Sequence, residues 1–129
     1  MLLTGVDILH VPRVAHVLEH HGRRFLERVF TPTEIAYCQH RAAALAARFA
    51  AKEAVAKALG VGVRILSAQG IGWHDVEVIS STSGRPTLHL AGRALELSHQ
   101  LQVAHWALSL SHEKEYVVAF VIALCRVTS

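Results

Sequence analysis

The sequence predicts an α+β fold, in which helices pack on a small, mainly antiparallel sheet in the order β-α-α-α-β-β-α-β-β. Three observations lead to this prediction. Short apolar runs that fit strands lie near both ends of the chain, an alanine-rich helical segment lies before its middle, and two pairs of runs in the second half are each joined by a polar turn. With 129 residues, the chain has the length of one domain, residues 1–129.

The first elements are a strand and a helical region. Residues 2–9 form a short apolar run, which predicts a strand, and Asp7 is the odd residue in it. A helix is expected over 12–20, because a proline at the first helical position lacks only an N–H that would have no partner there. Gly22 interrupts this region, and residues 23–29 fit another one or two helical turns.

A capping box begins the next helix. Thr31 can cap the N-terminus while Glu34 reaches back to it, and this helix is expected to run to about His40. The strongest helical segment follows over 41–59, which is dense in alanine, and Gly60 is placed to end it.

The second half of the chain predicts four strands and one helix. Two strands, 73–79 and 85–90, are joined by a polar turn, and a short amphipathic helix over 92–101 follows. The last two strands, 105–111 and 116–124, flank a charged turn.

These last two strands differ in their patterns. Apolar and polar side chains alternate over 105–111, whereas 116–124 lacks that alternation and is expected to be buried on both faces. Apolar residues make up 52% of the chain and charged residues 18%, an excess that is compatible with a buried subunit interface. A compositional bias towards alanine is the alternative explanation for the segment 42–58.

The charge of the chain limits its function classes. The net charge of +3 and the pI of about 9.2 fit nucleic acid, an anionic membrane, phosphorylated substrates or an acidic protein as partners. No nucleic-acid motif is present, and the ten histidines lack the spacing of a zinc site. We therefore expect no nucleic-acid partner.

The cysteines and the apolar segments point to the cytoplasm. Cys38 and Cys125 form no CxxC motif and are too few for a disulfide framework, so reduced thiols are expected. No signal peptide begins the chain, and the run over 116–125 has about half the length that a membrane helix needs. The sequence thus predicts a cytoplasmic protein with no membrane partner.

Two acidic residues are candidates for chemistry. Asp7 lies in an apolar strand, where a carboxylate is unfavourable unless it is paired, and Glu53 lies in the alanine-rich helix with Lys57 one turn later. In a structural interpretation they are a strand-end acceptor and a helical ion pair. In a functional one the two carboxylates meet around Mg²⁺, which often takes one or two carboxylates and completes its shell with water and phosphates. Arg48, Lys52 and Lys57 would then supply positive charge for those phosphates.

Two runs carry a resemblance to a known family. Residues 5–8 read Gly-Val-Asp-Ile, and residues 49–58 read Phe-Ala-Ala-Lys-Glu-Ala-Val-Ala-Lys-Ala. They resemble the G-x-D-[ILV] and [FW]-[ASC]-x-K-E-[AS]-x-x-K-A motifs of the holo-acyl-carrier-protein synthases, which are short bacterial phosphopantetheinyl transferases. The similarity extends over nearly the whole chain, including the runs 24–31, 60–62 and 109–112.

The resemblance implies an activity and a site. The family transfers 4′-phosphopantetheine from coenzyme A to a serine of an apo acyl carrier protein, with Mg²⁺, and releases 3′,5′-adenosine bisphosphate. It implies that Asp7 and Glu53 bind Mg²⁺ and that Lys57 acts at the phosphate under attack. Glu53, directly or through a metal-bound water, is a candidate to accept the serine proton, and the alternative is a route through water alone with Glu53 only as a metal ligand. The residues implied to contact coenzyme A are Arg48, Lys57, Gly60, Gly62, Ser109 and His112.

The resemblance also implies partners. The short family members form trimers, so a homotrimer is expected. The residues implied to face the acidic helix of the carrier protein are Arg13, Arg24, Phe25 and Arg28, although Arg24 and Arg28 also fit solvated positions on a helix surface. Whether the carrier serves fatty acid, polyketide or other synthesis stays open.

The chain departs from the family pattern at two positions. Ala107 stands where many members have a histidine, whose role would be absent here or taken over by His105 or His112, and Val61 replaces a usual threonine. The Ala107 departure motivates one alternative, a catalytically silent oligomer that binds coenzyme A or the carrier. Charge alone motivates another, a nucleic-acid-binding module, which would bind less tightly as salt rises and would ignore coenzyme A.

Overall fold

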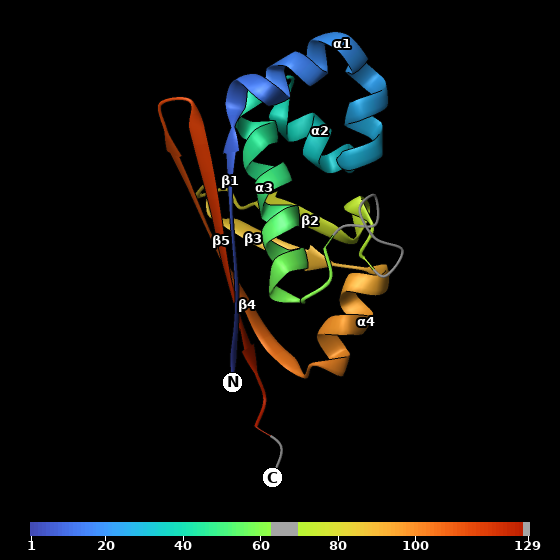
Figure 1. Ribbon diagram of the computed structural model, residues 1–129, viewed down its shortest axis with the longest axis vertical. Helices are drawn as coiled ribbons and strands as arrows, with labels where there is room; N and C mark the ends of the chain where they lie inside the picture. The colour runs from blue at the N-terminus through green and yellow to red at the C-terminus, as the bar shows by residue number, and fades with distance from the viewer. Residues whose placement is uncertain (63–69, 128–129) are drawn as a thin grey trace.

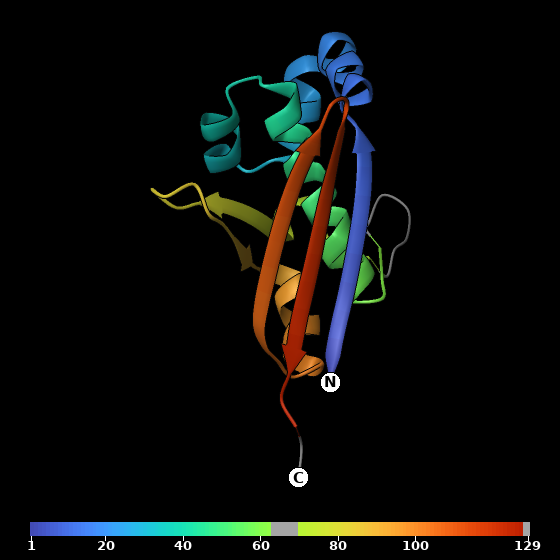
Figure 2. The same cartoon turned by 90° about the vertical axis from the view of Figure 1, so that its left-hand side faces the viewer.

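The described residues form two antiparallel sheets, where the sequence predicted one small sheet. In the computed structural model, which describes residues 1–62 and 70–127, three long strands form a sheet in the order β1-β5-β4. Two shorter strands form a separate hairpin of β2 and β3, which projects to one side of the long sheet (Figure 2). The strands are β1 (Leu2–His10), β2 (Val76–Ser80), β3 (Pro86–Leu90), β4 (Val103–Glu113) and β5 (Tyr116–Cys125).

The helices follow the expected order. One 3₁₀ turn, Trp73–Asp75, takes the place of the predicted start of β2. Figure 1 shows α3 lying along one face of the long sheet, with α1 and α2 at one end of the molecule and α4 towards the other. The helices are α1 (Val11–Val29), α2 (Pro32–Cys38), α3 (Ala42–Ala58) and α4 (Gly92–Gln100). The α+β class and the element order are therefore confirmed.

The signals at the helix ends act as predicted. The helical pieces on either side of Gly22 are joined in α1 with a kink, where Gly22 adopts a φ of +47° that favours glycine. The capping box is complete, because the Thr31 hydroxyl accepts the Glu34 N–H at 3.3 Å while Glu34 Oε1 accepts the Thr31 N–H at 3.0 Å. Gly60 follows the end of α3 with a φ of +78°.

The contact between α3 and β1 is unusually close at Gly5. A Cβ atom at this position would lie 1.9 Å from the backbone oxygen of Ala54, so only glycine allows the helix to approach the strand this far. Ala50 and Ala51 are fully buried in the same helix, and their small side chains let its backbone lie close to neighbouring elements. This packing places the C-terminal half of α3 directly beside the part of β1 that carries Asp7.

The expectation that β5 is buried on both faces is wrong for the single chain. Val117 and Val121 point towards α3 and are buried, whereas Phe120 and Leu124 on the other face are 39% and 46% exposed. Figure 2 looks onto this second face, which we call the outer face. The reason is that α3 covers the inner face of the sheet only. No helix in the described parts of the chain is long and apolar enough to cross a membrane.

Candidate active site

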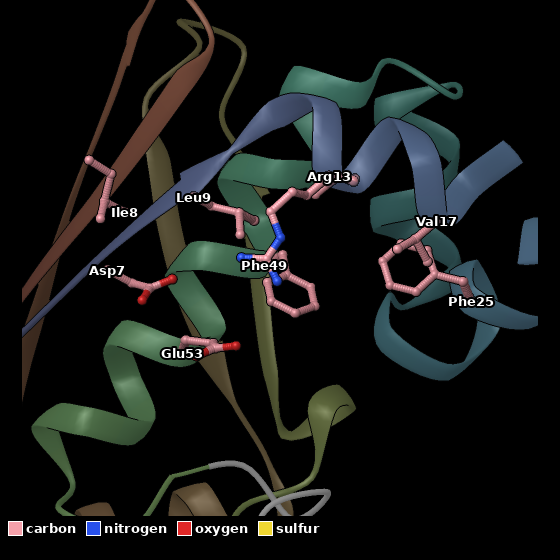
Figure 3. A pocket seen from close by; sticks show the side chains of 9 residues that line it. Asp7, Ile8, Leu9, Arg13, Val17, Phe25, Phe49 and Glu53 are labelled. Atoms are coloured by element: carbon pink, nitrogen blue, oxygen red, sulfur yellow. The ribbon is translucent and has the colours of Figure 1, made fainter. Parts of the chain in front are cut away.

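Asp7 and Glu53 line the same groove. Asp7 points inward from β1 because it alternates with the outward-facing Val6 and Ile8, and Glu53 projects from the middle of α3. Figure 3 shows both carboxylates and the Arg13 side chain of α1 directed into this groove. The strand and helix carboxylates are thus placed together, as the functional interpretation requires.

Lys57 joins the carboxylates from the next turn of α3. Its Nζ donates to Asp7 Oδ1 at 2.8 Å and to the backbone oxygen of Val6 at 3.0 Å. The Lys57 side chain is 53% exposed and the Asp7 side chain 13% exposed. The sequence predicted an ion pair between Lys57 and Glu53 within the helix. In the structure, the Lys57 ammonium donates its hydrogen bonds to two residues of β1 instead.

Glu53 lies in an environment that disfavours its charge. Burial raises the pKa of the Glu53 carboxyl, the nearby Asp7 carboxylate raises this pKa further, and Lys57 opposes the shift. The Asp7 carboxylate is bound by Lys57, and the Glu53 carboxylate is partly desolvated. A hard cation would relieve the repulsion between these two carboxylates, and such cations prefer oxygen ligands. Among residues 1–62 and 70–127 no group of three or more histidine, cysteine or acidic side chains is arranged for a metal.

Lys52 does not face this groove, and the expectation that it supplies charge to phosphates is wrong. Its side chain is fully buried on another side of α3, where Nζ donates to Glu34 Oε1 at 2.8 Å. Desolvation lowers the pKa of Lys52, and the Glu34 carboxylate opposes this change. Sequence reasoning used Glu34 only as a helix cap, because a partner 18 residues away leaves no signal in local spacing.

Arg48 is buried beside α2 and the hairpin. Its Nη2 donates to Ser80 Oγ at 2.9 Å, and its guanidinium lies 4.4 Å from the centre of the Tyr37 ring. The Nε atom is buried without a hydrogen-bond partner in the described part of the chain. A hydrogen bond with Ser80 lowers the pKa of the Tyr37 hydroxyl, as do the charges of Arg48 and Arg41. Ser80 and Tyr37 were missed from the sequence because only the fold brings them to Arg48.

The other residues implied for coenzyme A lie outside the groove. Gly60 and Gly62 follow α3, each with a φ of +78°, and their N–H groups bond to the last carbonyls of the helix. Ser109 is exposed on the outer face, and His112 Nε2 lies 3.0 Å from the backbone oxygen of Lys114 at the end of the β4–β5 hairpin. The single chain therefore does not bring Ser109 and Glu53 together.

The residues implied for a protein partner lie along α1. Arg13 and Phe25 line the groove beside the carboxylates, and Phe25 stacks on Phe49 of α3 with ring centres 6.3 Å apart. Arg24 and Arg28 are exposed beyond the Gly22 kink, and neither forms an ion pair within the described residues. Arg13 and Phe25 therefore line the groove, whereas Arg24 and Arg28 do not.

Comparison with known proteins identifies relatives over the whole fold. Residues 4–121 match the model of the 4′-phosphopantetheinyl transferase superfamily. The holo-[acyl-carrier-protein] synthase of Koribacter versatilis is 47% identical over 125 residues, which cover 95% of this chain and 97% of the relative. That of Herpetosiphon aurantiacus is 42% identical over 126 residues, covering 96% and 99%.

Solved structures agree with these relatives. The Helicobacter pylori holo-[acyl-carrier-protein] synthase in complex with coenzyme A superimposes with a TM-score of 0.83 at 27% identity and covers 95% of this chain and 100% of that one. A complex of the synthase from Chronobacterium ammoniagenes with coenzyme A gives a TM-score of 0.81 at 30% identity, with 98% of each chain covered.

Proposed function

The chain belongs to the 4′-phosphopantetheinyl transferase superfamily, and from this premise we propose that it transfers 4′-phosphopantetheine from coenzyme A to a serine of an apo acyl carrier protein in a Mg²⁺-dependent reaction. The observation that carries the proposal is the groove in which Asp7 and Glu53 meet beside Lys57. Residues 1–129 would act as one such transferase domain in the cytoplasm. Its two cysteines are free and buried, which suits a reducing compartment.

The proposed reaction is a phosphoryl transfer. The serine Oγ of the carrier forms a bond to the β-phosphorus of coenzyme A, the bond from that phosphorus to the bridging oxygen breaks, and 3′,5′-adenosine bisphosphate leaves. Such a reaction asks the protein mainly to position the reactants and to neutralise charge. Mg²⁺ held by Asp7 and Glu53 would neutralise charge on the pyrophosphate oxygens.

The protein's own residues supply the remaining roles. Lys57 donates two of its three ammonium protons to Asp7 and to the Val6 carbonyl, so one proton stays available for a phosphate oxygen. Glu53 is the candidate to accept the serine proton, either directly or by way of a metal-bound water molecule, and a route through water alone is the alternative. Arg48 and His112 are proposed to lie near a phosphate of the nucleotide.

We also propose a homotrimer with active sites at the subunit boundaries. The outer face carries apolar side chains on two adjacent strands, including Val6 at 52% and Ile8 at 62% exposure, which a second copy would bury. Ser109 lies on that face, opposite to the inward-facing Asp7, so it can contact a nucleotide only at a site on a neighbouring subunit. This shared site would explain why one chain separates the residues implied for coenzyme A.

Light scattering tests the assembly with a matched pair of variants. Phe120→Asp on the outer face should convert the trimer to monomers and abolish transfer. Leu95→Asp on α4, at a side chain with the same 39% exposure, should leave the trimer intact. A wild-type monomer at micromolar concentration would contradict the assembly.

The carrier is proposed to dock on α1. Arg24 and Arg28 are exposed and form no ion pair within the described residues, so their charges are available to an acidic helix of the carrier. Arg13 and Phe25 of the same helix line the groove. Exposed charges of this kind mainly set the association rate and the specificity.

Mass spectrometry of carriers tests the proposed function directly. The protein is incubated with coenzyme A, Mg²⁺ and a panel of apo carriers from fatty acid and polyketide synthesis, and a serine-linked gain of one phosphopantetheine is expected. Asp7→Ala and Glu53→Ala should abolish the gain while far-UV circular dichroism stays unchanged, because each loses a metal ligand. If either variant turns over at about the wild-type rate, Asp7 and Glu53 are not both metal ligands. If no carrier gains phosphopantetheine with the wild-type protein, a catalytically silent binding protein is favoured.

A further inference from the structure

Lys52 is anchored on the side of α3 that faces away from the proposed metal site. Its ammonium donates to Glu34 Oε1 at 2.8 Å, to the Trp73 carbonyl at 3.0 Å and to the Val76 carbonyl. An ammonium has three protons, so the group is saturated and has none left for a substrate phosphate. The side chain therefore joins α3 to α2 and to the start of β2.

Glu34 extends this anchor. Its Oε1 also accepts the Thr31 N–H at 3.0 Å, and its Oε2 accepts the Val78 N–H at 2.9 Å. Both side chains of the ion pair are fully buried. The carboxylate and the ammonium thus satisfy one another and four backbone groups, of which two belong to β2 and one to the 3₁₀ turn before it.

The opposite side of α3 is fixed by β1. A Cβ atom at Gly5 would meet the Ala54 carbonyl oxygen at 1.9 Å, so the helix backbone rests against the strand here. Lys52, Glu53 and Ala54 are consecutive, and successive side chains of a helix point about 100° apart. The residue before Glu53 is therefore held by β2 and the residue after it by β1.

We propose that Lys52 is a positioning residue, whose anchor to Glu34 and β2 sets the rotation of α3 and so directs the Glu53 carboxylate towards Asp7. This inference rests on the proposed function, because it assumes that the two carboxylates hold the cation. The contacts on the two sides of α3 together determine where the Glu53 carboxylate lies. Packing at Gly5 sets the distance between helix and strand, and the Lys52 anchor sets which way the helix faces.

Binding of Mn²⁺, followed by electron paramagnetic resonance without coenzyme A or carrier, tests the proposal. Lys52→Met retains most of the side-chain volume and removes all three bonds. We expect its Mn²⁺ affinity to fall about tenfold, which is the lower end of the effect seen when groups that orient metal ligands are lost. The matched control is Val55→Ala, which truncates another fully buried side chain of α3 and leaves the anchor intact; its affinity should stay within about twofold of the wild type.

If Lys52→Met does not fold, a second variant still tests the proposal. Lys52→Met combined with Glu34→Gln leaves no unpaired buried charge, so its unfolding midpoint should recover towards that of the wild type. Its Mn²⁺ affinity should nevertheless stay low, because the ties to the Trp73 and Val76 carbonyls are still missing. Recovery of the affinity together with stability would overturn the proposal, as would an equal loss in Val55→Ala.

The wild type and Glu53→Gln separate this inference from the proposed function. If the wild type binds Mn²⁺ and Glu53→Gln does not, the metal site exists, and an unchanged affinity in Lys52→Met then refutes the positioning role alone. If the wild type shows no Mn²⁺ binding that depends on Glu53, both the metal site and the positioning role fail.

Discussion

Two lysines of α3 form ion pairs that have the same N···O distance but differ in their exposure to solvent. Lys52–Glu34 and Lys57–Asp7 both have an N···O distance of 2.8 Å. The first pair is fully buried, whereas the Lys57 side chain is 53% exposed. The N···O distance of an ion pair therefore does not by itself indicate the function of the lysine. Burial also matters, because a buried ammonium can bond only to its protein partners, whereas an exposed one can also bind a substrate.

The energetics of the two pairs differ for the same reason. A buried ion pair contributes little net stability relative to apolar residues, but removal of one partner leaves an uncompensated charge in a low-dielectric interior. The Lys57–Asp7 pair interacts more weakly, because the Lys57 side chain is 53% exposed and water screens its charge, although the Asp7 side chain is only 13% exposed. Lys52–Glu34 is therefore suited to hold elements together, and Lys57–Asp7 to exchange partners.

Truncation of each carboxylate should give the largest contrast. Glu34→Ala should lower the free energy of unfolding by about 3–5 kcal/mol, because Lys52 stays buried without its partner. Asp7→Ala should lower it by less than about 1 kcal/mol. Urea unfolding at one fixed protein concentration measures both, and equal losses would show that burial does not separate the pairs.

Loss of Lys57 should affect turnover rather than stability. Lys57→Met should reduce kcat about a hundredfold, the effect of removing one donor aimed at a developing negative charge. Its urea midpoint should stay near that of the wild type. A rise in the KM for coenzyme A with unchanged kcat would mean that Lys57 binds the ground state and the transition state equally.

Gly5→Ala tests the other contact that positions α3. The added methyl group would meet the Ala54 carbonyl at 1.9 Å and must push the helix from β1, which should cost about 1–3 kcal/mol of stability and lower transfer. Ala54→Gly should not rescue the variant, because the clash is with backbone. Rescue by Ala54→Gly in a transfer assay would place the conflict at the side chain instead.

Charge reversal on exposed α1 should have the smallest effect. Arg24→Glu should raise the KM for the carrier by up to about fivefold without changing the KM for coenzyme A, because Arg24 is exposed and acts before the chemistry. The difference in the KM for the carrier between Arg24→Glu and the wild type should shrink as the salt concentration rises. Arg85→Glu in the exposed β2–β3 hairpin makes the same change in net charge and is the control. A fall in kcat alone would assign Arg24 to the active site.

Arg24 is a cleaner test of carrier docking than Arg13, although sequence reasoning treated them alike. Arg13 lines the groove with Asp7 and Glu53, so its reversal would disturb the proposed chemistry as well. Arg24 is exposed and is not among the residues that line the groove. The fold thus divides a set of arginines that the resemblance grouped together.

Local sequence determined the elements of this protein and their order. The Thr31 capping box, the glycine after α3 and the alternation in β4 depend on residues a few positions apart, so propensity and hydrogen bonding within a turn suffice to predict them. The candidate carboxylates Asp7 and Glu53 could be selected for a similar reason, because each is an acidic residue in an apolar segment.

Tertiary structure alone decided which charges are buried and which face of the sheet is open. Lys52 and Lys57 stand in one motif five residues apart, and their roles diverge because α2 and β2 cover one side of α3 while the other borders a groove. Likewise β5 is apolar on both faces, but one helix can cover only one of them. Burial depends on elements that are distant in sequence, and desolvation of a charge is fixed only when those elements pack against it.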